Sequence, residues 1–360
     1  MMLLTVLLTG GVGSRLRPLT YQMPKPLLPL MNRPFILYVL EYLARYKITD
    51  VVLTLSHKGE EIMEYFQMNP FPAVTVRFSM EKVPMGTAGA LKNVEPYVEG
   101  ESILVMNGDI LTDFPIHSLI EAHKKKGAKV TIALKEVEDP SAFGLVILGK
   151  GDRIKKFVEK PAEFEWIEDR TINAGIYVMD VDLLEKIPAG QEVSLERAFF
   201  PMLIADDVPV YGKVFDGYWL DVGTFSSYFK AHQDILAGKI RVSVPGKFKK
   251  SEGVWVQEHV KIAEGAEIKP PVFIGENTVI GEGVVISEYT VIGSRCTIQK
   301  DARVESSILH EEVLVGENAR IRESLLGKGV IIEPGVYIRS GNILGSGSVI
   351  TQGSILPSSF

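Results

Sequence analysis

Hydrophobic and polar positions follow two different patterns along this chain of 360 residues, and the pattern changes near residue 254. Before residue 238, short apolar runs alternate with stretches whose apolar residues have helical spacing. The runs at 51–55 and 103–106 predict buried strands, and the stretches 34–48 and 58–68 predict helices. This alternation predicts an α/β fold with a doubly wound, mostly parallel sheet, in which ligands bind at the carboxyl ends of the strands.

Beyond residue 254 an aliphatic residue returns at every sixth position, which is the signature of hexapeptide repeats in a parallel β-helix. These positions are Val256, Ile262, Ile268, Ile274, Ile280, Ile286, Ile292, Ile298 and Val304. A small or β-branched residue stands four positions after most of them, as the corners of a coil require. The register is interrupted near 306–310 and 323–329, which predicts short loops, and the repeat as a whole predicts roughly five coils.

These patterns divide the chain into three parts. A length of 360 residues is more than one hydrophobic core usually serves, so two domains are expected. We expect the α/β domain to span residues 1–237 and the β-helix to span 254–360, with a basic, loop-like linker at 238–253.

Composition narrows the class of protein. Hydrophobic residues make up 46% and charged residues 23% of the chain, as in a soluble globular protein. The formal net charge of −6 argues against nucleic-acid binding, which usually shows a basic surplus. The apolar N-terminal run is too short for a membrane span, and no basic segment precedes it, so no membrane association is expected. The single Cys296 excludes an internal disulfide and fits a reducing cytoplasm.

A glycine-rich loop, Gly10-Gly11-Val12-Gly13, directly follows the first predicted strand. Without Cβ atoms its backbone N–H groups can approach an anion closely. Arg15, Arg17 and Lys25 follow at once, so cationic side chains are available to the same anion. A Walker A loop is excluded because no Gly-Lys-Ser/Thr follows. The segment therefore predicts a polyphosphate site.

Three acidic residues beyond later predicted strands are candidates for binding roles. Asp109 comes after the strand at 103–106 and has the oxygen chemistry that Mg²⁺ prefers. Asp113 has the same chemistry, but its place beside Phe114 and Pro115 favours a turn or cap residue. Glu81 follows the apolar run at 74–78, and its carboxylate can only accept hydrogen bonds. The alternative for Glu81 is an ordinary solvated loop residue.

Two longer strings identify a family resemblance. The pattern GGxGxRLxPLT followed by PKPLxPxxxxP resembles the signature of the sugar-1-phosphate nucleotidylyltransferases, and every fixed position is present between residues 10 and 34. Further similar stretches occur at 81–91, 143–146, 157–161, 172–177 and 217–224. Residues 81–91 resemble the family's nucleotide-base loop, in which an acceptor-only Glu81 would suit the adjacent N1–H and N2 amino donors of guanine. Ser194 to Pro201 resembles a stretch of mannose-1-phosphate guanylyltransferases, which is a second indication of GTP. The resemblance continues through a C-terminal left-handed β-helix.

The resemblance implies a reaction of GTP with mannose 1-phosphate that gives GDP-mannose and pyrophosphate. It implies a nucleotide site at Leu8, Gly10, Gly11, Gly13, Arg15, Glu81, Gly86 and Thr87. It implies a sugar-phosphate site at Gly144, Glu159, Lys160 and Asn173. The resemblance also implies that Arg15, Lys25, Asp109 and Asp221 are the catalytic residues and that the two aspartates bind Mg²⁺. By chemistry alone, Glu159 and Lys160 could be a surface pair, and Asn173 an exposed residue at a strand start.

Several alternatives stay open. The nearest is a glucose-1-phosphate thymidylyl- or uridylyltransferase, and another is a nucleotide-sugar-sensing regulatory subunit without catalysis. Hexapeptide β-helices also form acyltransferases that use a histidine, for which His259 and His310 are the candidates. The end of a β-helix leaves unpaired backbone edges that partners can cover, so an assembly role and a homo-oligomer are expected.

Overall fold

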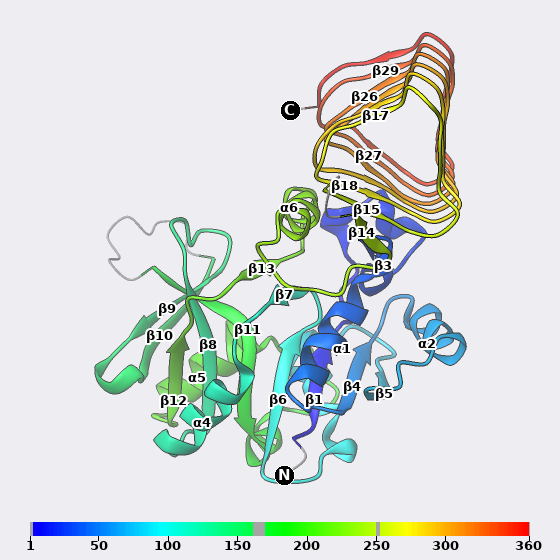
Figure 1. Cartoon of the computed structure of the whole chain (residues 1–360). Helices are drawn as coiled ribbons and strands as arrows, with labels where there is room; N and C mark the ends of the chain where they lie inside the picture. Colours follow the sequence, from blue (N-terminus) through cyan, green and yellow to red (C-terminus); the bar gives the residue numbers. More distant parts are fainter. Residues whose placement is uncertain (1–2, 161–169, 250–252, 360) are drawn as a thin grey trace. The chain divides into compact units, whose positions relative to one another are not determined.

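The computed structural model describes residues 3–160, 170–249 and 253–359. By internal contacts it forms two compact units, drawn in Figure 1. The α/β unit comprises Met1–Val12 and Ile36–Asp221, and the β-helix unit comprises Gly13–Phe35 and Val222–Phe360. This division differs from the boundaries at 237 and 254, which follow sequence periodicity and stay a prediction. Part of the predicted linker, residues 250–252, lies outside the described residues.

The α/β unit is built on a nine-stranded mixed sheet in the order β10-β9-β11-β6-β1-β4-β5, with β8 beside β11 and β12 beside β8. The strands are β1 (Thr5–Leu8), β4 (Asp50–Leu55), β5 (Thr75–Met80), β6 (Ser102–Asn107), β8 (Val130–Glu136), β9 (Gly144–Leu148), β10 (Ile154–Glu159), β11 (Thr171–Asp180) and β12 (Val210–Val214). Strands β5, β4, β1 and β6 are parallel, as predicted. Strand β11 is antiparallel to β6, β8 and β9, so the expectation of a mostly parallel sheet was wrong for this half. Strands β9 and β10 are antiparallel as well, because only residues 149–153 join them, and these are too few for the crossover that a parallel pair requires.

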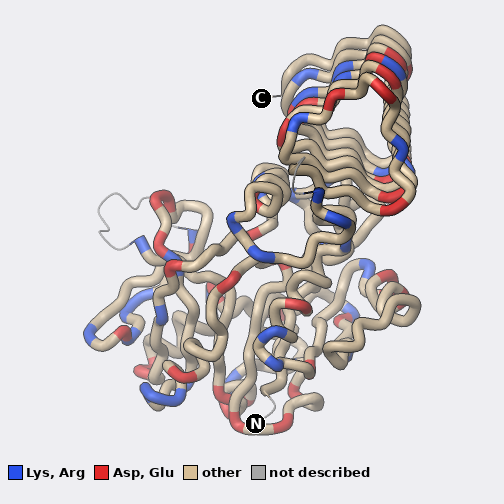
Figure 2. The backbone as a smooth tube through the Cα atoms, viewed as in Figure 1, with Lys and Arg blue, Asp and Glu red and all other residues tan. Residues whose placement is uncertain are grey.

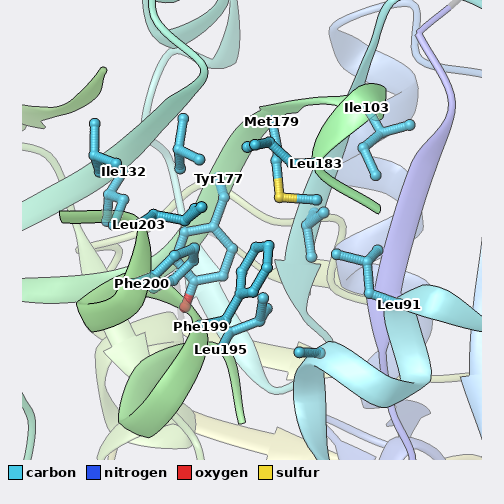
Figure 3. Packing of buried hydrophobic residues seen from close by; sticks show 14 of the residues in the cluster. Leu91, Ile103, Ile132, Tyr177, Met179, Leu183, Leu195, Phe199, Phe200 and Leu203 are labelled. Carbon is cyan, nitrogen blue, oxygen red and sulfur yellow. The ribbon is translucent and has the colours of Figure 1, made fainter. Parts of the chain in front are cut away.

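The helices of this unit are α1 (Phe35–Arg45), α2 (Gly59–Met68), α3 (Gly86–Lys92), α4 (Ile116–Lys126) and α5 (Phe200–Ala205). The first two confirm the helices predicted at 34–48 and 58–68. Its core gathers residues from the sheet, α3 and α5, as Figure 3 shows. Tyr177 lies fully buried there, with its ring 5.0 Å from that of Phe200 in an edge-to-face arrangement. In the described part of the chain, no helix combines the length and apolar character needed to cross a membrane.

The hexapeptide repeats form a parallel β-helix with three sheets. The first follows the order β15 (Val254–Val256), β18 (Val272–Ile274), β21 (Thr290–Ile292), β24 (Ile308–Leu309), β27 (Leu325–Leu326) and β30 (Ile343–Leu344), and β14 (Lys247–Lys249) adds antiparallel to β15. The second follows the order β16 (Lys261–Ile262), β19 (Val279–Ile280), β22 (Thr297–Ile298), β25 (Leu314–Val315), β28 (Ile331–Ile332) and β31 (Val349–Ile350). The third follows the order β17 (Glu267–Ile268), β20 (Val285–Ile286), β23 (Arg303–Glu305), β26 (Arg320–Arg322), β29 (Tyr337–Ile338) and β32 (Ile355–Leu356). The pairing begins at β15 (Val254–Val256) and ends at β32 (Ile355–Leu356), which makes six coils where about five were predicted from the repeat. The expected short loops are absent from the described coils. The interruptions are coils shortened by one residue, since Val272 pairs with Thr290 but Val291 pairs with Ile308. Strand pairing therefore continues without a break.

The interior of the coils is apolar, and charged side chains recur on the outer surface. Ile292, Cys296 and Ala302 are fully buried in this interior. Burial raises the pKa of the Cys296 thiol to about 12, which makes it a small core residue rather than a reactive one. Figure 2 shows basic and acidic positions recurring from coil to coil, and Arg295 pairs with Glu312 at 2.9 Å.

The β-helix unit also contains a buried group of one tyrosine and two histidines. Helix α6 (Phe225–Leu236) opens with a capping box between Thr224 and Ser227 and carries Tyr228 and His232. The Tyr228 hydroxyl donates to the Pro29 carbonyl and lies 3.1 Å from His310 Nε2. Burial lowers the pKa of His310 to about 4. Burial, and then the nearby His310, lower the pKa of His232 to about 3. His310 is thus packed inside the unit, which does not favour the acyltransferase alternative.

The lowered pKa values of His232 and His310 predict that acid reduces the free energy of unfolding. Both pKa values are lowered from the unfolded value of 6.5, so the unfolded chain binds more protons between pH 6.5 and about 4. The stabilisation is complete above pH 6.5, and the free energy of unfolding should fall by up to roughly 1.4 kcal/mol per pH unit for each histidine below it. Urea unfolding at pH 7.5, 6.5 and 5.5 measures this slope. His232→Asn should reduce the slope of unfolding free energy against pH by the equivalent of about one proton taken up on unfolding. Equal slopes in the two proteins would contradict the lowered pKa of His232.

Candidate active site

The glycine-rich loop leaves the carboxyl end of β1, in the middle of the parallel strands. Thr9 Oγ1 donates to the carbonyl of Thr54 at 2.6 Å, which fixes the start of the loop to β4. Ser56 Oγ, just beyond β4, donates to the carbonyl of Gly10. A Cβ on Gly10 would lie 3.1 Å from Ser56 Oγ, so this glycine fits its own protein surroundings.

Gly11 differs from the glycines around it. A Cβ placed on Gly11 meets no atom within 4 Å, and its φ lies outside the left-handed region. Nothing in the described packing therefore requires glycine at this exposed position. A bare backbone facing open space is the feature expected where a ligand must approach main-chain N–H groups.

Asp109 and Asp221 reach the same end of the sheet from different parts of the chain. Leu8 pairs with Asn107, and the N–H of Gly108 donates to the carbonyl of Leu8 at 2.9 Å, so the turn carrying Asp109 begins beside the loop after β1. Asp221 pairs with Ile110, the neighbour of Asp109, in the ladder of β13 (Trp219–Asp221) and β7 (Ile110–Thr112). The register brings both predicted metal-binding aspartates to adjacent positions.

Asp113 is a structural residue, as its position in the sequence predicted. Its Oδ1 accepts the N–H of Tyr218 at 2.7 Å. A Cβ on Gly217 would collide with the same oxygen, so the turn closes tightly around this carboxylate.

Arg15 and Lys25 belong to the β-helix unit. Arg15 lies in a 3₁₀ turn, Ser14–Leu16, and Lys25 begins another, Lys25–Leu27. Gly13 precedes them with φ +63°, and its carbonyl accepts the Thr20 hydroxyl at 2.9 Å. A Cβ on Gly13 would lie 3.2 Å from Cβ of Lys25, so this glycine permits both the turn and the approach of the lysine.

Glu81 follows β5 and is only 9% exposed, so the expectation of a solvated loop glutamate does not describe it. Its Oε2 accepts the N–H of Met85 at 3.2 Å and closes the loop that leads into α3. Burial raises the pKa of this carboxyl, and the Met85 hydrogen bond partly opposes the rise. Gly86, at φ +69°, would place a Cβ 2.5 Å from the carbonyl of Val193. Glycine is thus required at position 86 because the backbone of Val193 lies against it.

Thr87 ties α3 to the turn Leu195–Phe199. Its hydroxyl donates to Glu196 Oε2 at 2.8 Å and accepts the N–H of Leu195 at 2.7 Å. Glu196 was not among the predicted site residues, because a glutamate two positions after the capping Ser194 suits any helix start. Only its long-range contacts to Thr87 and Tyr177 place it beside the predicted site residues.

The predicted sugar-phosphate residues gather around Glu196. Asn173 Nδ2 donates to the Tyr177 hydroxyl at 2.8 Å, and that hydroxyl lies 3.4 Å from Glu196 Oε1. Glu159 is opposite Gly144 in the β10–β9 pair, and a Cβ on Gly144 would lie 2.9 Å from Glu159 Oε2. Burial, and then the charge of Glu196, raise the pKa of Glu159. The cluster therefore concentrates hydrogen-bond acceptors for hydroxyl groups.

Lys160 completes this part of the site. Its Nζ lies 3.9 Å from Glu159 Oε1, and its side chain is half exposed, so the side chain is accessible to an anionic ligand. Its N–H donates to the carbonyl of Phe143 at 3.0 Å, which holds the backbone beside β9. Pro161, the last residue of the motif at 157–161, lies outside the described residues.

A Glu159→Gln variant should separate binding from folding. We expect the KM for a sugar 1-phosphate to rise about 10- to 100-fold, because a carboxylate accepts hydroxyl hydrogen bonds more strongly than an amide. Because the folded pKa is raised, the charged carboxylate opposes folding at neutral pH, so the melting temperature should stay equal or rise. Steady-state kinetics with thermal unfolding measures both. An unchanged KM would remove Glu159 from the sugar site.

Comparisons with known proteins agree with the fold. A family model described as Nucleotidyl transferase matches residues 4–238, and one described as EIF2B subunit epsilon LbH domain matches residues 251–356. The second match agrees with a left-handed β-helix.

Among the proteins similar to this chain are two curated relatives and one solved structure. Mannose-1-phosphate guanylyltransferase of Mycobacterium tuberculosis is 37% identical over 65% of this chain and 64% of its own length, so the match spans less than two thirds of that relative. UTP–glucose-1-phosphate uridylyltransferase of Synechocystis sp. is 32% identical over 76% of this chain and 74% of its own length. A crystal structure of HddC from Yersinia pseudotuberculosis complexed with GMP-PN is 28% identical, with a TM-score of 0.56, and the match covers 64% of this chain and 98% of that one. Since the first family model matches well over half of the residues, the chain belongs to the nucleotidyl transferase family.

Proposed function

We propose that this chain is a mannose-1-phosphate guanylyltransferase, which joins GTP and mannose 1-phosphate into GDP-mannose and releases pyrophosphate. The observation that carries the proposal is the juxtaposition of the open backbone at Gly11 with the turn carrying Asp109, beside Asp221. A polyphosphate needs main-chain donors and a cation, and this end of the sheet offers a place for both.

The reaction is an in-line displacement at the α-phosphorus of the nucleotide. An oxygen of the sugar phosphate forms the new P–O bond while the bond between the α-phosphorus and the bridging oxygen to the β-phosphate breaks, and pyrophosphate leaves with that electron pair. The attacking oxygen is already anionic, so no general base is required. Alignment and neutralisation of charge supply the catalysis. Arg15 would bind the triphosphate and the departing pyrophosphate, and Lys25 the α-phosphate with the incoming sugar phosphate.

The residues present fit a magnesium ion. Among the described residues no three His, Cys, Asp or Glu side chains gather as a metal cluster. Asp109 and Asp221, brought to adjacent positions by the β13–β7 register, would hold the ion together with substrate phosphates, the arrangement that Mg²⁺ commonly adopts in phosphoryl-transfer sites. When bound, the ion would neutralise phosphate charge.

Guanine and mannose are the finer part of the proposal. Glu81 is an acceptor-only side chain in the loop before α3, which suits the two adjacent donors of guanine. The mycobacterial relative is named for mannose 1-phosphate and guanylyl transfer, and HddC was crystallised with GMP-PN. The relative from Synechocystis favours uridylyl transfer to glucose 1-phosphate as a second candidate function.

A substrate panel tests the proposal. Pyrophosphate release is measured with GTP, ATP, UTP and dTTP, each with mannose 1-phosphate and with glucose 1-phosphate. The highest kcat/KM for GTP with mannose 1-phosphate supports the proposal, and the highest value for UTP with glucose 1-phosphate supports the second candidate. No turnover with any pair would favour a regulatory, nucleotide-sugar-sensing subunit.

Base selection should depend on Glu81. We expect Glu81→Gln to reduce the preference for GTP over UTP by about tenfold or more, because the amide presents a donor where guanine needs an acceptor. The ratio of kcat/KM for the two nucleotides is the measurement. Because the amide oxygen can still accept the Met85 N–H, the loop should keep its shape, and thermal unfolding checks this. A selectivity ratio within twofold of the wild-type value would exclude this role.

We also propose a cytoplasmic location and a homo-oligomer. Outward positions in the β16-β19-β22-β25-β28-β31 sheet expose apolar side chains at Val279, Ile331 and Val349, with 41%, 38% and 52% exposure. An apolar face of this kind suits contact with a second copy. Light scattering of the wild-type protein and of a Val349→Lys variant tests this.

A further inference from the structure

The segment that carries Arg15 and Lys25 is built into the β-helix unit. Residues Gly13–Phe35 fold with the β-helix rather than with the sheet that precedes them in the chain. The segment contains short 3₁₀ turns and a two-stranded hairpin formed by β2 (Pro29–Leu30) and β3 (Arg33–Pro34). Contacts within this one compact unit therefore fix the position of the segment relative to the coils.

One side of the β-helix is apolar on its outer surface as well as inside. In the β15-β18-β21-β24-β27-β30 sheet, the coil interior is filled by residues such as Ile274 and Ile292. Their sequence neighbours Phe273 and Val291 point the other way and are nevertheless buried, with 0% and 2% exposure. This side is thus covered, whereas the sheet containing Val279 exposes its outer apolar residues.

The covering elements are the Gly13–Phe35 segment and α6. A Cβ on Gly345 would lie 3.3 Å from Cβ of Pro18, so the segment touches the coil at this point. Tyr228 on α6 joins Pro29 of the segment to His310 of the coil. The contacts among the segment, α6 and the coils are buried, so the β-helix holds the segment in place.

Asn32 makes the most specific contact between the segment and the coils. Its Nδ2 donates to Gln257 Oε1 at 2.7 Å and to Ser294 Oγ at 2.6 Å, across 225 and 262 residues of sequence. Both Met31 and Asn32 have positive φ, 47° and 62°, at the tip of the β2–β3 hairpin. Such backbone angles are costly for a buried methionine and persist only where the surroundings fix them.

We propose that Asn32 is a positioning residue, which through Gln257 and Ser294 of the β-helix fixes the segment that presents Arg15 and Lys25 to phosphate. The proposal rests on the proposed function, because the phosphate-binding role of the two cations comes from it. It gives the β-helix a part in the reaction without a site of its own. Asn32 acts only through the backbone that leads to the two cations.

The test uses the full chain with Asn32→Asp, which keeps the side-chain size and tolerates positive φ but cannot donate the two hydrogen bonds. We expect the KM for GTP to rise, or kcat to fall, at least tenfold. Ser294→Ala should give a smaller change in the same direction, and the double variant should be no worse than Asn32→Asp alone, because Asn32→Asp already removes the hydrogen bond that Ser294→Ala removes. Hydrogen exchange of the amides in 13–35 should become faster in both single variants.

Asn342→Ala is the matched control. Asn342 is 9% exposed and donates two hydrogen bonds, to the carbonyls of Arg339 and Pro357, within the β-helix. It should lower the melting temperature without changing KM, kcat or exchange in 13–35. If Asn32→Asp keeps wild-type kinetics and exchange, the proposal is overturned. If the wild-type protein shows no turnover, the proposed function fails, and exchange alone decides whether Asn32 fixes the segment.

Discussion

Asp109→Asn should abolish turnover and leave the fold intact. Asparagine has nearly the same volume, and Asp109 lies in the turn between β6 and β7 rather than in the buried core. The change removes one of two carboxylates available to hold magnesium against the phosphates. Metal-derived charge stabilisation amounts to several kcal/mol, so kcat should fall by about 10³-fold or more. Pyrophosphate release at saturating substrates, together with circular dichroism and thermal unfolding, measures both parts of the expectation.

Asp113→Asn is the matched control for this variant. It makes the same chemical change four residues further along, where the side chain accepts the N–H of Tyr218. An amide oxygen can make that contact, so turnover should stay within a few fold of the wild-type value. Near wild-type rates for Asp109→Asn, or equal losses in the two variants, would contradict the assignment of Asp109 as the metal ligand.

Much of the fold could be predicted because hydrophobic periodicity reports local structure directly. The sixfold repeat of isoleucine and valine identified the β-helix, and the alternation of runs identified the α/β part. The antiparallel β11 was missed because a buried strand has the same apolar composition whichever direction its neighbours run. Placement of Gly13–Phe35 with the β-helix was missed because it depends on contacts such as Asn32 with Ser294, which are far apart in sequence.

The site could be predicted where a residue's chemistry is unusual for its position. Asp109 after a buried strand and a run of glycines after another are such cases. Glu196 and Tyr177 could not be found this way, because one resembles a helix-capping residue and the other a core aromatic. Their hydrogen-bonding contact exists only after β11 and the turn at 195–199 come together.

Gly11→Ala provides the most direct test of the phosphate-binding loop. A Cβ at this position meets no protein atom within 4 Å, and φ is not in the left-handed region, so alanine should fit the folded protein. Its stability should be unchanged or rise by about 0.4–1 kcal/mol, because alanine restricts the unfolded chain. The added methyl group would occupy the space through which phosphate oxygens reach the backbone N–H groups. We expect kcat/KM for GTP to fall by about 10²-fold or more, since one misplaced ångström at a reacting group has this effect.

Gly127→Ala is the control for Gly11→Ala, because it should reduce stability and leave activity unchanged. Gly127 caps α4 at φ +56°, and a Cβ placed there would also face open space, so alanine meets backbone strain but no steric clash. It should lower the free energy of unfolding by about 1–2 kcal/mol and leave kcat/KM unchanged. The pair therefore separates loss of ligand approach from loss of stability. If Gly11→Ala binds and turns over GTP like the wild-type protein, phosphate does not approach the backbone at Gly11, and the open space there has another cause.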